Sequence, residues 1–175
     1  MPNFPPVAHQ GAVSADDRIS AIDFVNRVNW LFETWDVDAM VESFLPDAAV
    51  FHFHGSFRGH AELRSFFANE YPYLIPGVSR HATNHIVDAD EPEGVVVRYQ
   101  MLLIRHAFPD TAPGVPSVDG VVDSPYGLPS IWLYSPMLDR LRRADRGWRI
   151  YERHIGPSVF RPASNTTAKL SHQNA

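Results

Sequence analysis

Hydrophobic residues recur every three or four positions between residues 15 and 35, which predicts an amphipathic helix with a wide apolar face. Ser14, followed three residues later by Asp17, is typical of a capping box and predicts the start of this helix. A second helix is expected to begin after the N-cap Asp36 and to end at Pro46, which cannot continue it. The main stripe of the first helix consists of Ala21, Phe24, Val28, Leu31 and Trp35.

The pattern then changes to short apolar runs that are typical of strands. Residues 48–57, AAVFHFHGSF, are expected to form one strand, and residues 59–71 a third helix. The segment from Phe108 to Pro129 is rich in proline and glycine, and we expect it to be a long loop that gates the site. The remaining strands are expected at about residues 80–89, 94–107, 129–143 and 147–156.

This order of elements predicts an α+β fold. Successive strands joined by short turns pair antiparallel, and the helices of the N-terminal half are expected to cover one face of the sheet. A curved, mostly antiparallel sheet closed by three helices forms a cone with an apolar pocket inside. We expect a single domain over residues 14–159, with a flexible arm before it (1–13) and a flexible tail after it (160–175).

Composition narrows the possible partners. The net charge is −5 and the pI about 5.9, so no strong basic field favours nucleic acid or an anionic membrane. The chain has no cysteine, which excludes disulfides and thiolate chemistry. It shows neither a signal-peptide pattern nor an apolar run near the ~20 residues that span a bilayer, so we expect a cytoplasmic protein. Nine histidines and 12% aromatic residues are typical of a protein that forms a pocket.

Two of these histidines, His52 and His54, raise a choice between metal binding and proton transfer. If residues 48–57 form one strand, both imidazoles lie on one face and Phe51 and Phe53 on the other. A metal site would need further ligands from separate elements, and no downstream pattern supplies them, so we expect neither metal nor cofactor. Histidine titrates near neutral pH, which favours acid–base chemistry.

Three stretches resemble the NTF2-like superfamily, and within it the SnoaL-like and scytalone dehydratase-like branch. "WLFETWDVDAMVESFLPDAAV" resembles the first helix of the family running into its capped second helix. "GSFRGHAELRSFF" is similar to the entry of the third helix, and "LDRLRRADRGWRIYERHI" to the last hairpin. Together they span roughly residues 15–157, and the resemblance implies the same cone fold.

The resemblance also implies a catalytic set. "SRHATNH" resembles the strand that carries the family's catalytic histidine and places His81 there, and "RYQMLLIRH" places His106 at its partner. The acidic position late in the first helix falls on Glu33. Arg80 and Arg105, each just before a candidate histidine, are expected on the outer face of the sheet or at its rim.

Substrate-binding positions are implied in the same way. Two tyrosine positions of the dehydratase fall on Phe32 and His52, and Asp36 is either a helix cap or the acidic partner in place of Glu33. The many aromatic residues suit a flat or polycyclic ligand. The expected substrate-binding residues are His52, His54, Phe32, Asp36, Trp132 and Tyr99.

The resulting hypothesis is a dehydratase that needs no cofactor and acts on a hydrophobic, carbonyl-bearing cyclic molecule such as a polyketide, steroid or aromatic-pathway intermediate. An isomerase or a cyclase would use the same proton shuttle. The alternatives without catalysis are a small subunit of a ring-hydroxylating dioxygenase and a ligand-binding protein. We expect a small hydrophobic substrate as the partner, neither nucleic acid nor membrane, and a homodimer or homotrimer.

Overall fold

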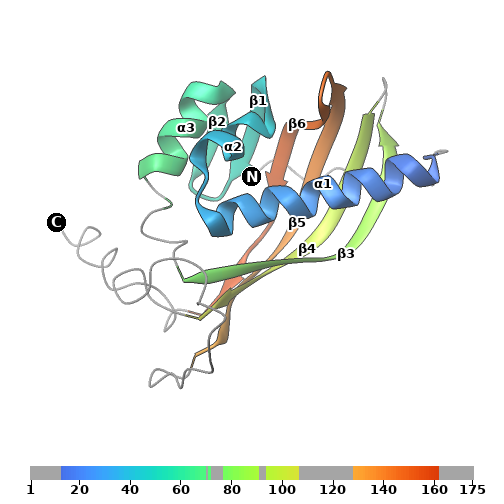
Figure 1. Ribbon diagram of the computed structural model, residues 1–175. Coiled ribbons are helices and arrows are strands. Elements are labelled where there is room, and N and C mark those ends of the chain that lie inside the picture. Colours follow the sequence, from blue (N-terminus) through green and yellow to red (C-terminus); the bar gives the residue numbers. More distant parts are fainter. Residues whose placement is uncertain (1–12, 70, 72–76, 91–93, 107–127, 162–175) are drawn as a thin grey trace.

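The computed structural model describes residues 13–69, 71, 77–90, 94–106 and 128–161 (Figure 1). The expected gating segment from Phe108 lies outside these residues up to position 127. The elements are α1 (Ala15–Thr34), α2 (Val37–Glu42), β1 (Phe44–His52), β2 (Gly55–Arg58), α3 (Gly59–Asn69), β3 (Val78–Asp90), β4 (Gly94–Arg105), β5 (Ser130–Ala144), β6 (Gly147–Ile155) and β7 (Val159–Phe160). The three helices and the four long strands after α3 follow one another in the expected order, but two strands instead of one precede α3, and a short strand β7 follows the last of them.

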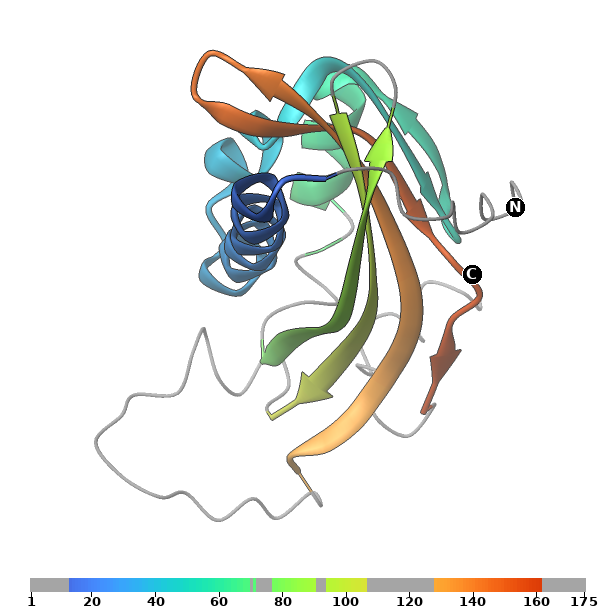
Figure 2. The same ribbon diagram turned by 90° about the vertical axis from the view of Figure 1, so that its right-hand side faces the viewer.

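The strands form one curved sheet in the order β2-β1-β6-β5-β4-β3, with β7 paired to β5. Neighbouring strands are antiparallel except β1 and β6, which run parallel. Helix α1 lies across the concave side of the sheet, and α2 and α3 gather at one end of it (Figures 1 and 2). We call the side that packs against α1 the inner face. The predicted α+β fold is confirmed.

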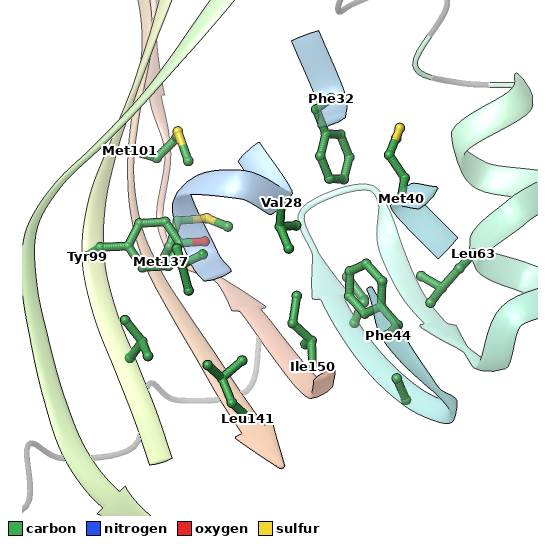
Figure 3. Packing of buried hydrophobic residues seen from close by; sticks show 14 of the residues in the cluster. Val28, Phe32, Met40, Phe44, Leu63, Tyr99, Met101, Met137, Leu141 and Ile150 are labelled. Carbon is green, nitrogen blue, oxygen red and sulfur yellow. The ribbon is translucent and has the colours of Figure 1, made fainter. Parts of the chain in front are cut away.

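The N-cap of α1 is the predicted one, but of the predicted stripe only Ala21 and Val28 are fully buried, and Phe24, Leu31 and Trp35 are partly buried. The Ser14 side chain accepts a hydrogen bond from the Asp17 backbone N–H (3.0 Å), as an N-cap does. The helix ends where Trp35 adopts a left-handed conformation (φ 61°). The inward stripe meets side chains that point from the sheet, as Figure 3 shows for Val28, Tyr99 and Met137. The fully buried residues of the helix are Ala21, Val25, Val28, Asn29 and Phe32.

Two predicted boundaries are wrong in the region of residues 37–58. The second helix ends at Glu42, and β1 begins at Phe44 and includes Pro46. The pairing of β1 with β6 is irregular between Phe44 and Ala49, so a proline fits there without breaking a regular ladder. The predicted single strand over 48–57 is a hairpin, because the chain turns at residues 53 and 54 between β1 and β2.

A buried ion pair joins three adjacent strands on the inner face. Arg153 on β6 donates from Nε and Nη2 to the two carboxylate oxygens of Asp139 on β5 (2.6 and 2.7 Å). The Tyr99 hydroxyl on β4 donates to the same carboxylate (2.9 Å). Burial lowers the pKa of Arg153, but the charge and hydrogen bonds of Asp139 together with Tyr99 and Tyr71 outweigh it, and the pKa is raised overall. The guanidinium therefore stays charged in the interior.

No helix among the described residues is long and apolar enough to cross a membrane.

We expect Asp139→Asn to lower the free energy of unfolding by about 3–5 kcal/mol, because it leaves a buried guanidinium without its counter-charge. Asparagine has nearly the same size as aspartate, so the loss in free energy of unfolding measures the effect of removing the charge. Urea unfolding followed by circular dichroism measures it. The matched control is Asp38→Asn, which breaks the solvent-exposed pair with Arg64 and is expected to cost about 0–1 kcal/mol. Equal, small losses in both variants would contradict this account.

Candidate functional site

A β-bulge in β3 decides which side chains of this strand face inward. Between the pairs Thr83–Gln100 and Ile86–Arg98, two residues of β3 lie opposite one residue of β4. Asn84 takes up the extra length in a left-handed conformation (φ 55°), which asparagine tolerates better than most residues. Its side-chain amide donates to Gln100 Oε1 (2.8 Å). The bulge shifts the alternation of side chains by one position.

The two histidines of β3 therefore lie on opposite faces. His81 pairs with Leu102 on the outer face and is exposed. His85 is half-buried, and its ring stacks on the inward-facing Tyr99 with 5.6 Å between centroids. The expectation that His81 lines the interior is not met, because side-chain alternation places position 81 outside and the bulge brings position 85 inside. The sequence carried one signal for this, an asparagine inside a strand pattern in the triplet Thr83-Asn84-His85.

The environment of His85 keeps its imidazole neutral. Burial lowers the pKa of His85, although the charge of Asp139 acts in the opposite direction. Its Nε2 atom is buried and has no hydrogen-bond partner in the structure. A neutral imidazole with a free ring nitrogen in the interior can accept a proton from a bound molecule.

Glu33 and His106 lie within electrostatic reach of each other at the C-terminal end of α1. Glu33 Oε1 accepts a hydrogen bond from the Arg80 backbone N–H (2.7 Å), which ties α1 to β3. The backbone N–H of His106 donates to the Gly77 carbonyl (2.9 Å). Burial lowers the pKa of His106, Glu33 opposes this shift, and Arg105 adds to it. The structure thus brings together two members of the predicted catalytic set and leaves His81 apart.

Two arginines expected on the outer face or the rim point inward instead. The Arg80 guanidinium lies over the Phe32 ring (4.6 Å), and the Arg105 guanidinium over the Trp132 ring (4.3 Å). Desolvation lowers the pKa of both, in Arg105 to about 10. The sequence-based prediction placed them outside because each directly precedes a histidine that was expected to face inward, and neighbouring strand residues alternate between faces. They belong to the site.

Aromatic rings form the wall beside Arg80. The ring of Phe32, on α1, packs edge-on against Phe67 (5.2 Å) and Tyr71 (5.6 Å). Tyr71 is buried, and desolvation raises the pKa of its hydroxyl, although the nearby charge of Arg80 acts against this shift. Tyr99 is also buried, with its hydroxyl directed to Asp139. This wall gives the site its apolar character.

The other predicted binding residues divide between interior and surface. His52 faces the aromatic wall, with its ring 5.2 Å from Phe66 and 6.3 Å from Tyr71. His54 is exposed in the turn after β1, and its backbone N–H donates to His52 Nδ1 (3.1 Å). The two imidazoles therefore do not share a strand face as expected. Asp36 is exposed, and its side chain caps α2 by accepting from the Ala39 N–H (3.0 Å).

Within the described part of the chain, no three histidine, aspartate or glutamate side chains converge as metal ligands would.

Several solved structures are similar to this chain in fold. The structure of Aln2 from a Streptomyces species is 12% identical with a TM-score of 0.65, over 94% of this chain and 100% of that one. A protein of unknown function with a cystatin-like fold from Nostoc punctiforme is 16% identical (TM-score 0.62; 86% and 95%). A protein named as a candidate scytalone dehydratase from Novosphingobium aromaticivorans is 15% identical (TM-score 0.59; 85% and 91%). These similarities show an NTF2-like, cystatin-like fold.

A family model for the SnoaL-like domain matches residues 13–154. The chain belongs to this SnoaL-like family, as the resemblance of its sequence motifs implied. No match is found among the curated proteins.

We expect His85 to titrate below the ordinary histidine value of about 6.5, because burial disfavours the imidazolium. Two-dimensional NMR spectra of the histidine rings across a pH series measure this, with His85→Gln identifying the resonance. The same shift predicts that the contribution of His85 to stability is complete above about pH 6.5 and falls at lower pH, since the unfolded chain then binds more protons. A midpoint at or above 6.5 would contradict the burial argument.

Proposed function

We propose that this protein is a cofactor-independent lyase, a dehydratase, that acts on a hydrophobic, carbonyl-bearing cyclic small molecule. The observation that carries the proposal is the free Nε2 of His85, buried on the inner face with a lowered pKa. We assign to His85 the role of proton acceptor, in place of His81. Glu33 and His106 stay in the proposed set as a second polar group at the end of α1.

The chemistry needs one proton shuttle. A β-elimination removes a proton from the carbon next to a carbonyl and releases the β-hydroxyl group as water, leaving a conjugated double bond. Neutral His85 accepts the carbon-bound proton, and the imidazolium formed then returns that proton to the departing hydroxyl. Atoms balance without an oxidant or reductant. A carbon-bound proton next to a carbonyl is acidic enough for a base of this strength only when the developing enolate is stabilised, which requires donors close to the carbonyl oxygen.

The surroundings support a cyclic, hydrophobic substrate. The ring of Tyr99 stacks on His85, and the wall of Phe32, Phe66 and Tyr71 is aromatic. Membership of the SnoaL-like family and the similarity to a protein named as a candidate scytalone dehydratase fit this reading. A fold of this kind carries many activities, so the proposal depends on the histidine and not on the fold.

We expect His85→Gln to lower turnover by at least about 100-fold, because it removes the proposed base while keeping a similar side-chain volume. The assay follows the appearance of a conjugated enone by its absorbance, over a panel of bicyclic β-hydroxy ketones. His81→Gln, on the outer face of the same strand, is the matched control and is expected to retain near-wild-type turnover.

Far-ultraviolet circular dichroism and thermal unfolding of both variants check that the fold is kept. Loss of turnover in His81→Gln with retention in His85→Gln would restore the assignment made from the sequence. Proton exchange at the carbon next to the carbonyl without release of water would instead show an isomerase.

A further inference from the structure

We propose that Arg80 binds an anionic oxygen, that of a carboxylate, on the ligand of this site. This inference rests on the proposed function only in taking that ligand to be the substrate, and it narrows the substrate to acids. Three observations support it: the guanidinium of Arg80 is buried with unused donors, the neighbouring carboxylates are engaged elsewhere, and Arg80 lies on the same face of β3 as His85.

The guanidinium of Arg80 is buried without a carboxylate partner. Its Nε and Nη1 atoms are shielded from solvent and form no hydrogen bond in the structure. No carboxylate among the described residues lies within ion-pair distance of it, whereas Arg153 has such a partner in Asp139. The groups beside it are the face of the Phe32 ring and the hydroxyl of Tyr71. The Nε and Nη1 donors of Arg80 are thus not used by hydrogen bonds within the protein.

The neighbouring carboxylates are already engaged elsewhere. Both oxygens of Asp139 accept hydrogen bonds from Arg153. Glu33 turns Oε1 to the backbone N–H of Arg80 and acts only weakly on its side chain. The other groups that act favourably on the guanidinium are two buried hydroxyls, which stay uncharged at neutral pH because burial raises their pKa: those of Tyr71 and Tyr99.

A buried cation without a counter-charge is costly, and a bound anion removes that cost. Arginine suits a carboxylate because its planar donors match the carboxylate oxygens. Arg80 and His85 both lie on the inner face of β3 and both act on Tyr99. A ligand held by its carboxylate at Arg80 therefore extends along the strand toward His85, which places its reacting carbon near the base.

The test compares an acid with its neutral analogue. Isothermal titration calorimetry measures the binding of 2-naphthoate and 2-naphthamide, which differ in charge and little in shape. We expect the wild-type protein to bind the carboxylate at least about tenfold more tightly, a difference of about 1.4 kcal/mol. Arg80→Gln should abolish this preference while keeping the weaker affinity for the amide. Arg64→Gln, at an exposed position, is the matched control and should keep the preference.

Equal affinity of the wild-type protein for acid and amide, or no detectable binding of the acid, would overturn the proposal without any variant. A preference that survives in Arg80→Gln would overturn it as well. If Arg80→Gln does not fold, Arg80→Lys replaces it and should weaken the preference, since it keeps the charge and loses the planar donors.

The same titrations with His85→Gln separate this inference from the proposed reaction. The variant should keep the preference for the acid although it loses turnover. A preference that depends on Arg80 together with turnover that does not depend on His85 would refute the reaction and leave the anion site standing. Turnover that depends on His85, together with equal affinity for acid and amide, would refute the anion site and leave the proposed reaction standing.

Discussion

The ion pair between Arg153 and Asp139 is the interaction around which the inner face is organised. It lies between β5 and β6, and Tyr99 connects it to β4. Replacing such a pair by apolar side chains is often neutral or favourable for stability, so its presence in the core needs another explanation than stability. Its effect here is to hold the Tyr99 ring in one orientation, and His85 stacks on that ring. The geometry of the candidate base thus depends on a charge pair in the interior of the sheet.

The position of α1 follows from the apolar side chains beside this ion pair. The apolar stripe of α1 packs against the apolar side chains of the concave side, which removes both surfaces from water. Glu33 and Phe32, in the last turns of this helix, then reach β3 through the Arg80 backbone and the Arg80 side chain. The helix is therefore both the lid of the core and a part of the candidate site.

Most of the fold could be predicted from the sequence because its signals are local. The apolar period and the Ser14 cap define α1, and the order of strands defines a meander, so neither requires knowledge of distant contacts. The errors arise where pairing with residues far apart in the chain determines whether a residue lies in a helix, a strand or a turn. Pro46 lies in a strand because β6 pairs irregularly there, and His54 lies in a turn because β2 folds back on β1.

The candidate site was harder to predict because successive side chains of a strand point to opposite faces of the sheet. A single extra residue reverses every assignment beyond it, so the choice between His81 and His85 depended on an irregularity that composition does not reveal. Arg80 and Arg105 were misplaced for a related reason, because each directly precedes a histidine that was expected to face inward. Tyr99 and Phe32, which follow regular alternation and a regular helical stripe, were placed in the interior correctly.

The bulge at Asn84 has a consequence for protein engineering. A bulge bends its strand as well as shifting the alternation of side chains, so Asn84 contributes to the curvature of the wall. Deleting this one residue would leave Arg80 and His85 facing inward, because it restores a one-to-one pairing with β4 on both sides. The lining would be kept and the wall straightened. The curvature of this wall can thus be changed at one position while Arg80 and His85 keep their inward orientation.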